Sequence, residues 1–373
     1  MNDFLTITCH NAYNYGAVLQ TYALYKYLRE IELNGKVIDY RPSDLHKTKS
    51  DKIIVKLFRP IIRYLDFKKG DKIFGNFLNE NIELTSVVHN SNEILNVEKT
   101  KCYITGSDQV WNCSKNGVGN DENYFLVFAD GRNVKKVSYA ASIAMDKIDD
   151  KQKEKFNRLL ADFSYISVRE KTGVKILNDI GIQNVSQVLD PVYLISRVEW
   201  KNMARRSKYY DKLKNQNYIL VYGFLRQKNV YDYAFKLAKK NNCKVYNVNT
   251  MIEDYFLKTD KYFWNVTPED FLALILNANS IVTNSFHGLS FSIIFQKDFY
   301  LFGKDGNTSS RMFDLVNMLK LDDRVVRKGN VMSEEKIDYC KCNEILMEKI
   351  KESKEYLKKV FEEEKKWIKK KNY

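Results

Sequence analysis

The sequence predicts an α/β protein with two Rossmann-like domains, and three observations support this fold class. Short apolar runs that end in polar loops alternate with segments that carry apolar residues at helical spacing, a pattern typical of βαβ units and parallel sheets. The pattern pauses after Leu189-Asp190-Pro191 and resumes at Tyr218. The length of 373 residues suits two domains of ordinary size. We therefore expect two α/β domains with a cleft between them.

The N-terminal domain is expected over residues 1–195. A strand at 5–9, a helix with apolar residues from Val18 to Leu28 and a strand at 37–40 form a βαβ opening. Further strands are predicted at 102–105, 136–141 and 165–168, with an amphipathic helix at 151–163.

The C-terminal domain is expected over residues 196–330, and residues 331–373 are expected to form a charged helical tail. The strands of this domain are predicted at 218–222, 244–248, 278–283 and 299–302. A helix is predicted to begin at Thr267-Pro268, because threonine is a good N-cap and proline suits the first turn of a helix. The helix of the tail is predicted over 344–371.

The composition indicates where the protein works. It is 44% hydrophobic with 15 glycines and 4 prolines, so it can build cores without long disordered linkers. No segment is long and apolar enough to span a bilayer, and the N-terminus lacks the features of a secretory signal. The six cysteines are scattered, which favours reduced thiols. We therefore expect a cytoplasmic protein.

The net charge of +14 favours an anionic partner, such as a nucleic acid, an anionic membrane surface or a phosphorylated substrate. Solubility alone is the alternative explanation. The chain has neither the glycine pattern of a dinucleotide site nor a P-loop. It has no acidic or histidine cluster at clear metal-ligand spacing, so no metal is predicted. It has no recognised nucleic-acid motif, so nucleic acid is not predicted as a partner.

The stretch 284–290 is the most informative part of the sequence, because it follows a predicted strand at 278–283. Open α/β sheets bind ligands at the carboxyl ends of their strands. Ser285 or its neighbour Asn284 can cap the following helix, whose positive end favours an anion beside His287. Gly288 lets backbone approach a ligand, and histidine exchanges a proton near neutral pH. The alternative is an ordinary strand-to-helix corner with a hydrogen-bonded histidine.

Six blocks of the sequence resemble one known family. They occur in the order 14–20 (NYGAVLQ), 106–112 (GSDQVWN), 138–142 (SYAAS), 167–170 (SVRE), 189–191 (LDP) and 284–288 (NSFHG). Together they are similar to the polysaccharide pyruvyl transferase family. The resemblance implies a fold similar to the GT-B glycosyltransferases. It also implies transfer of pyruvate from phosphoenolpyruvate, as a ketal, to a sugar of a bacterial surface polysaccharide precursor, with no further cofactor.

Ketal formation from an enol phosphate requires a general acid, because the methylene carbon must gain a proton. The resemblance makes His287 this acid. The carboxylate and the phosphate of the donor require cationic groups. The predicted donor-binding residues are Arg169, implied by the resemblance, Arg311, which follows the last predicted strand, and Ser285 and Gly288.

Both arginines have structural alternatives. Arg169 could form a surface salt bridge with Glu170. At the position of Arg311 the alternative is helix capping by Ser309 or Ser310.

The predicted acceptor-binding residues are Asn14, Tyr15, Gly16, Ser107 and Trp111. The first three begin the first helix and would face the cleft. Trp111 could stack on a sugar face, and core packing is its alternative. Asp108 could accept a proton from the attacking hydroxyl or hold the sugar, and a helix N-cap is its alternative.

The stretch 47–72 mixes apolar residues with lysines and arginines, which suits an anionic bilayer surface. A lipid-diphosphate-linked acceptor would lie at such a surface, so a peripheral contact with the inner face of the membrane is one hypothesis. Packing against the N-terminal domain is the other. Pro60 is expected to interrupt any single helix in this stretch. The sequence gives no indication of an oligomeric state.

Two other functions stay open. A GT-B-like glycosyltransferase that uses a nucleotide sugar has the same expected fold, and fold does not fix function. A basic nucleic-acid-binding protein is the non-enzymatic alternative.

Overall fold

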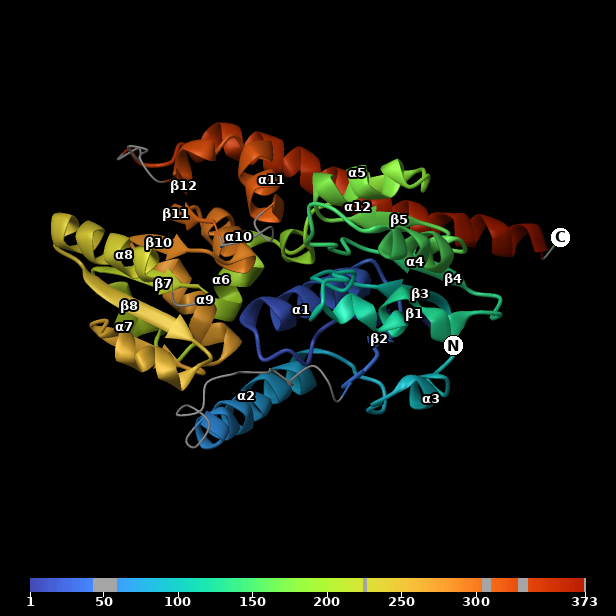
Figure 1. Ribbon diagram of the computed structural model, residues 1–373, viewed down its shortest axis with the longest axis horizontal. Helices are drawn as coiled ribbons and strands as arrows, with labels where there is room; N and C mark the ends of the chain where they lie inside the picture. The colour runs from blue at the N-terminus through green and yellow to red at the C-terminus, as the bar shows by residue number, and fades with distance from the viewer. Residues whose placement is uncertain (43–58, 224–226, 304–309, 328–334, 372–373) are drawn as a thin grey trace.

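The computed structural model describes residues 1–42, 59–223, 227–303, 310–327 and 335–371. Two parallel β-sheets follow one another along the chain. Figure 1 shows them at opposite ends of the long axis, with α1 (Tyr15–Glu30) and α6 (Arg197–Arg205) between them. The predicted fold class, α/β with two Rossmann-like units, is confirmed. The exact domain boundaries stay predictions.

The N-terminal sheet has the strand order β2-β1-β3-β4, with all pairs parallel. Its strands are β1 (Asn2–Ile7), β2 (Gly35–Val37), β3 (Thr100–Thr105) and β4 (Lys135–Ser138). A parallel pair, β5 (Ile166–Val168) and β6 (Val185–Gln187), continues from β4 through isolated bridges. The helices are α1, α2 (Arg59–Asn81), α3 (Ser91–Ile94), α4 (Asp150–Leu160) and α5 (Lys171–Asp179), with 3-10 turns η2 (Val118–Asn120), η3 (Glu122–Phe125), η4 (Val127–Ala129) and η5 (Pro191–Tyr193).

The C-terminal sheet has the strand order β12-β11-β10-β7-β8-β9, again all parallel. Its strands are β7 (Tyr218–Tyr222), β8 (Lys244–Asn249), β9 (Lys261–Trp264), β10 (Ser280–Thr283), β11 (Asp298–Phe302) and β12 (Val325–Val326). Its helices are α6, α7 (Tyr210–Lys214), α8 (Lys228–Asn241), α9 (Pro268–Asn277), α10 (Phe286–Ile294), α11 (Ser310–Met318) and α12 (Tyr339–Lys371), with η6 (Ile252–Leu257) and η7 (Asp322–Arg324). Thr267 caps α9 as predicted.

Each sheet contains a point where the strand order reverses. The order reverses between β1 and β3 in the N-terminal sheet, and between β7 and β10 in the C-terminal sheet. Open α/β sheets bind ligands beside such points, at the carboxyl ends of the strands. The loops that leave β1 and β3 carry Asn14 and Asp108, and His287 lies in the first turn of α10, which follows β10 directly. The topology therefore brings the predicted site loops to the ligand-binding edges of the two sheets.

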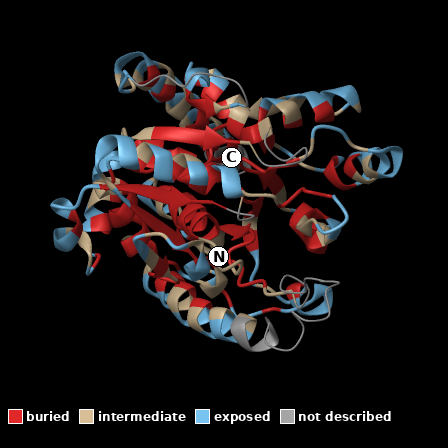
Figure 2. Cartoon of the chain, turned by 60° about the vertical axis from the view of Figure 1, so that its left-hand side comes forward, coloured by how far each residue is buried: buried red, intermediate tan, exposed pale blue. Residues whose placement is uncertain are grey.

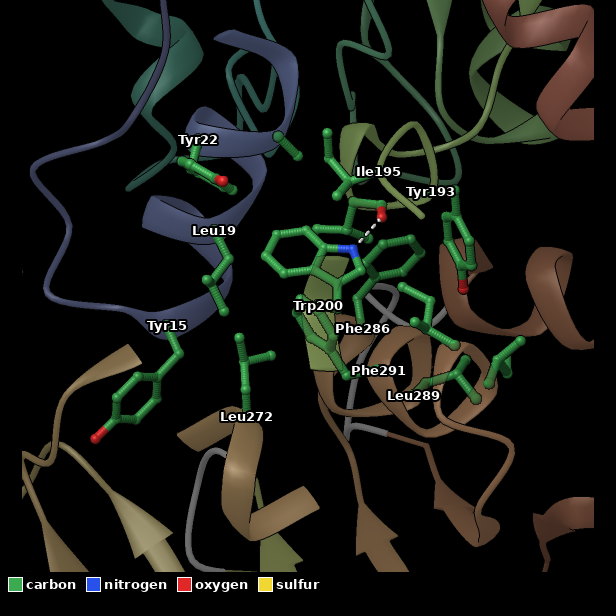
Figure 3. Packing of buried hydrophobic residues seen from close by; sticks show 14 of the residues in the cluster. Tyr15, Leu19, Tyr22, Tyr193, Ile195, Trp200, Leu272, Phe286, Leu289 and Phe291 are labelled. Carbon is green, nitrogen blue, oxygen red and sulfur yellow. Dashed lines mark hydrogen bonds between the residues drawn. The ribbon is translucent and has the colours of Figure 1, made fainter. Parts of the chain in front are cut away.

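Aromatic side chains join the two halves of the molecule in one apolar cluster. Trp200 of α6 packs edge-on against Tyr22 of α1 and Phe291 of α10, with ring centroids 5.8 and 5.1 Å apart, and its Nε1–H donates to the Val192 carbonyl at 2.9 Å (Figure 3). Figure 2 shows that buried residues run through the strands and the central helices. Burial of each such side chain contributes about 1.5–3 kcal/mol, so the cluster holds α1 firmly against the C-terminal half.

Helix α12 crosses from the C-terminal half to the N-terminal half (Figure 1). Near its start, the Tyr339 hydroxyl donates to the Lys297 carbonyl at 2.7 Å. Further along, the Tyr356 hydroxyl donates to the Ser138 carbonyl at 2.8 Å, and Leu357 is fully buried. The predicted C-terminal helix is therefore confirmed, but its charged sequence conceals a buried face that links the two sheets.

Helix α2 covers part of the predicted basic stretch 47–72, of which residues 47–58 lie outside the described residues. Pro60 lies in the first turn of α2, where its missing N–H costs nothing. Because α2 begins at Arg59, the predicted interruption of a helix through 47–72 stays a prediction. Asp66 Oδ1 accepts hydrogen bonds from the Ile252 N–H at 2.9 Å and the Trp264 indole N–H at 2.6 Å. The helix is thus fastened to the C-terminal half. No described helix is long and apolar enough to cross a membrane.

Candidate active site

His287 lies at the strand-to-helix corner that the sequence predicts. Strand β10 ends at Thr283, and the Ser285 hydroxyl caps α10 by accepting the Gly288 N–H at 3.4 Å. The imidazole is buried, with 6% of the residue exposed. Its Nε2 lies 3.5 Å from Asp190 Oδ2. Ser285 therefore acts as the predicted N-cap and holds the helix start beside His287.

Arg169 follows β5 and forms a buried ion pair. Its Nη1 donates to Asp190 Oδ2 at 2.5 Å, and neither side chain has more than 2% of its surface exposed. Glu170 does not pair with Arg169, because its Oε1 accepts the backbone N–H groups of Ile143 and Ala144 at 2.8 and 3.0 Å. The surface salt bridge considered for Arg169 is therefore wrong. A buried guanidinium at this sheet edge is placed to bind an anion.

Arg311 lies in the first turn of α11, close to Arg169. The guanidinium carbon of Arg311 lies 5.9 Å from the centre of the Phe286 ring, and that of Arg169 lies 4.1 Å from it. With the Gln109 amide oxygen turned toward Arg311, this oxygen accepts from Nη1 and Nη2 at 2.9 Å each. A small pocket lies here, lined by both arginines, Phe286, Asp190 and Gln187. Two cations therefore line one small pocket.

Charge interactions inside the cluster shift its pKa values. Burial raises the pKa of the Asp190 carboxyl, but the stronger combined influence of His287 and Arg169 holds that pKa well below its usual range. Burial and the neighbouring Arg169 lower the pKa of Arg311 to about 10. Asp190 is thus an anion and Arg311 a cation at neutral pH. The two close cations raise the local positive potential, which favours an anionic ligand.

Several polar atoms of this cluster have no partner. Among the described residues, the buried atoms without a hydrogen bond include Arg169 Nε and Nη2, Arg311 Nε and His287 Nε2. Leaving such donors unpaired in a protein interior costs free energy, so they are typically satisfied by a ligand or by water. The unpaired arginine nitrogens belong to both of the arginines predicted for donor binding. His287 Nε2 faces the Asp190 carboxylate, which lies 3.5 Å away.

Asp108 lies at the edge of the cluster. Its Oδ1 is 3.8 Å from Arg169 Nη2, and its side chain keeps 20% of its surface exposed. Its backbone has a positive φ of 72°, which is uncommon for a residue other than glycine. The next described helical element begins only at Val118, so Asp108 does not cap a helix and the N-cap alternative is wrong. The carboxylate is free to face a substrate beside the arginines.

The structure contradicts three of the predicted acceptor contacts. Trp111 is fully buried, stacks on Phe125 and donates from Nε1 to the Tyr124 carbonyl at 3.2 Å. Tyr15 is fully buried, and its ring stacks on Phe271 of α9 at 4.5 Å. Ser107 is buried too.

The Ser107 hydroxyl donates to Asp190 Oδ2 at 3.0 Å. These three side chains offer no surface to a sugar. Asn14 Oδ1 caps α1 by accepting the N–H groups of Gly16 and Ala17. An acceptor contact by the half-buried Asn14 stays a prediction.

Both glycines predicted in the site are needed for packing. A Cβ on Gly288 would lie 2.4 Å from Thr283 Oγ1 and 3.0 Å from Tyr222 Cδ1, so the space beside it holds protein atoms and not a ligand. The predicted donor contact of Gly288 stays a prediction. A Cβ on Gly16 would lie 1.9 Å from His287 Nδ1. Gly16 thus lets α1 approach the imidazole closely, whereas its acceptor contact stays a prediction.

Three residues of the cluster are not predicted as site residues: Asp190, Phe286 and Gln109. All three lie inside the sequence blocks that carry the resemblance. Asp190 precedes a proline, which predicts only a turn, and nothing local indicates that Arg169 and His287 meet it. Among the described residues, no group of three or more His, Cys, Asp or Glu side chains is placed to hold a metal ion.

The comparison with protein families decides the assignment of this chain. The model of the family described as polysaccharide pyruvyl transferase matches residues 14–306. The chain belongs to this family. The match begins just before α1 and ends just after β11, and it includes Asp108, Arg169, Asp190 and His287. None of the curated proteins compared with this family member matches it significantly.

Solved structures similar to this pyruvyl transferase family member include sugar-nucleotide enzymes. S. aureus MnaA, solved with UDP, is 13% identical with a TM-score of 0.50, covering 88% of this chain and 84% of that one. The UDP-N-acetylglucosamine 2-epimerase from Rickettsia bellii is 12% identical with a TM-score of 0.49, covering 96% and 95%. Medicago truncatula UGT71G1, solved with UDP-glucose, is 10% identical with a TM-score of 0.47, covering 95% and 93%. At these identities the likeness concerns the fold alone, which is GT-B-like as predicted.

Proposed function

We propose that the protein transfers pyruvate from phosphoenolpyruvate to two hydroxyl groups of one sugar in a polysaccharide precursor and releases phosphate. The observation that carries this proposal is the cluster of buried, unpaired cationic nitrogens of Arg169 and Arg311 beside His287. Phosphoenolpyruvate carries a carboxylate and a phosphate, and arginine forks form paired hydrogen bonds with both groups. Family membership supports the same reaction class.

The proposed chemistry begins with proton transfer. His287 gives a proton to the methylene carbon of the enol phosphate, which leaves positive charge at C2. A sugar hydroxyl then forms the first C–O bond at C2 and gives its proton to Asp108. The bond between C2 and the phosphate oxygen breaks. A second hydroxyl of the same sugar then closes the ketal and gives its proton to the neutral His287, which restores the acid. Arg169 and Arg311 neutralise the departing phosphate.

The acceptor is proposed to be a sugar linked to a lipid diphosphate at the inner face of the membrane. The basic and apolar sequence of 47–72 supports a peripheral contact with an anionic surface. Three apolar side chains of its helical part, Tyr64, Leu65 and Phe67, keep more than 40% of their surface exposed. The proposal includes no metal and no cofactor besides the donor.

Donor binding is tested by the thermal stability of the purified protein. Phosphoenolpyruvate at about 100 times its Kd should stabilise the fold by about 2.7 kcal/mol. The Arg169→Lys variant should lose most of this stabilisation, because lysine lacks the planar fork. Arg205→Lys is the matched control, since Arg205 is an exposed residue of α6. Stabilisation by a UDP-sugar but not by phosphoenolpyruvate would favour the glycosyltransferase alternative and contradict the proposal.

A further inference from the structure

Asp190 is the carboxylate at the centre of the site. It lies beyond the end of β6 and only 1% of the residue is exposed. Its Oδ1 accepts the Val192 N–H at 3.1 Å and thereby caps η5. This bond fixes the orientation of the carboxyl group, so Oδ2 is the oxygen that faces the other side chains of the cluster.

Three groups from separate segments converge on Asp190 Oδ2. Arg169 Nη1 lies at 2.5 Å, the Ser107 hydroxyl at 3.0 Å and His287 Nε2 at 3.5 Å. Arg169 follows β5 and Ser107 follows β3 of the N-terminal half, whereas His287 belongs to α10 of the C-terminal half. A carboxylate this deeply buried is stable only when it is paired and hydrogen-bonded. The same contacts restrict where its three partners can lie.

The imidazole of His287 is confined by a second group from the N-terminal half. Gly16, at the start of α1, lies so close to the ring that a Cβ there would be 1.9 Å from Nδ1 and 2.3 Å from Cγ. The ring of the preceding residue, Phe286, packs against Arg169, whose guanidinium carbon lies 4.1 Å from the ring centre. His287 therefore cannot turn freely, and the carboxylate of Asp190 is the acceptor nearest to its Nε2.

We infer that Asp190 is a positioning residue that accepts the Nε2–H of His287 and leaves Nδ1 to deliver the catalytic proton. In that step the Nδ1–H bond breaks, a C–H bond forms at the methylene carbon of the donor, and the imidazolium becomes neutral with its remaining proton on Nε2. Asp190 also occupies Nη1 of Arg169 and leaves Nε and Nη2 of the same guanidinium for the anionic groups of the donor. The transfer of the Nδ1 proton to the donor rests on the proposed function, whereas the contact between Asp190 and His287 does not.

The first test uses protein labelled with ¹⁵N-histidine and needs no substrate. The chain has four histidines, so the His287→Gln variant assigns the His287 signals by their loss. The neutral ring of His287 should carry its proton on Nε2, because a carboxylate faces that nitrogen. A neutral ring protonated on Nδ1 overturns the inference.

The second test compares two buried carboxylates. Asp190→Asn should move the His287 signals and lower acceptor-dependent phosphate release by about 100-fold, because a misplaced acid loses much of its catalytic effect. Glu170→Gln is the matched control, since Glu170 is also 1% exposed but holds the loop at Ile143 and Ala144. In the Glu170→Gln variant the ¹⁵N signals of His287 should stay at their wild-type positions.

The outcomes separate the inference from the proposed function. Wild-type signals and rate in Asp190→Asn overturn the positioning role, as does an equal signal shift in Glu170→Gln. If Asp190→Asn does not fold, the tautomer of His287 in the wild-type protein decides whether Asp190 accepts the Nε2–H. A wild-type protein that releases no phosphate from phosphoenolpyruvate with any acceptor contradicts the proposed function, while the tautomer still tests Asp190.

Discussion

Replacement of His287 by glutamine should lower acceptor-dependent phosphate release by about 10²- to 10⁴-fold, the usual contribution of a general acid. Glutamine has an amide near the position of an imidazole nitrogen, but it cannot give up a proton near neutral pH. Arg169 and Arg311 remain in place, so phosphoenolpyruvate should still stabilise the variant against heat. The measurement is the rate of phosphate release at saturating donor and acceptor, paired with the thermal shift.

The control for this prediction is the same change at an exposed histidine. His89 lies on the surface, and its Nδ1 lies 3.2 Å from the Arg41 carbonyl. His89→Gln should release phosphate at the wild-type rate. A His287→Gln enzyme that keeps more than a tenth of the wild-type rate would show that another group supplies the proton.

Gly16→Ala should be nearly inactive although alanine favours a helix. The added Cβ would lie 1.9 Å from His287 Nδ1, so either the imidazole or the start of α1 must move. A displacement of about 1 Å in a catalytic group can cost about 10²-fold in rate. Overpacking of this kind also costs about 1–3 kcal/mol of stability. The measurements are phosphate release, thermal stability and the ¹⁵N signals of His287.

Gly75 supplies the matched control for the glycine substitution. It lies inside α2, and a Cβ there would meet no atom within 4 Å. Gly75→Ala should keep the wild-type rate and gain up to about 1 kcal/mol of stability from its helix propensity. A Gly16→Ala enzyme with unchanged rate and unchanged His287 signals would contradict the close packing of α1 on the imidazole.

Local patterns predict much of the fold and the position of the helix starts. Thr267 and Ser285 cap α9 and α10 as their sequences indicate, because capping depends on residues within one turn. Pro60 lies in the first turn of α2, a position that is compatible with proline. The helix itself is fastened by Asp66 to a segment far along the chain, a contact that no local pattern indicates.

The site is harder to predict, because burial and long-range contacts decide its roles. Trp111 and Tyr15 lie in blocks that resemble the family, yet their side chains fill the core. An aromatic residue in a loop has the same local signature whether it packs inside or faces a substrate. Asp190 becomes central only because Arg169 and His287, from two different halves, meet its carboxylate. Such convergence is a property of the tertiary fold.

The most direct test of the central claim is the mass of an acceptor after incubation with the enzyme and phosphoenolpyruvate. The acceptors are lipid-linked galactose, mannose and glucose, each with and without the donor. We expect one of them to gain the mass of one pyruvate less one water, with one phosphate released per product formed. Acceptors that stay unmodified with phosphoenolpyruvate, while a nucleotide sugar adds a hexose to one of them, would contradict the pyruvyl transfer proposed for this site.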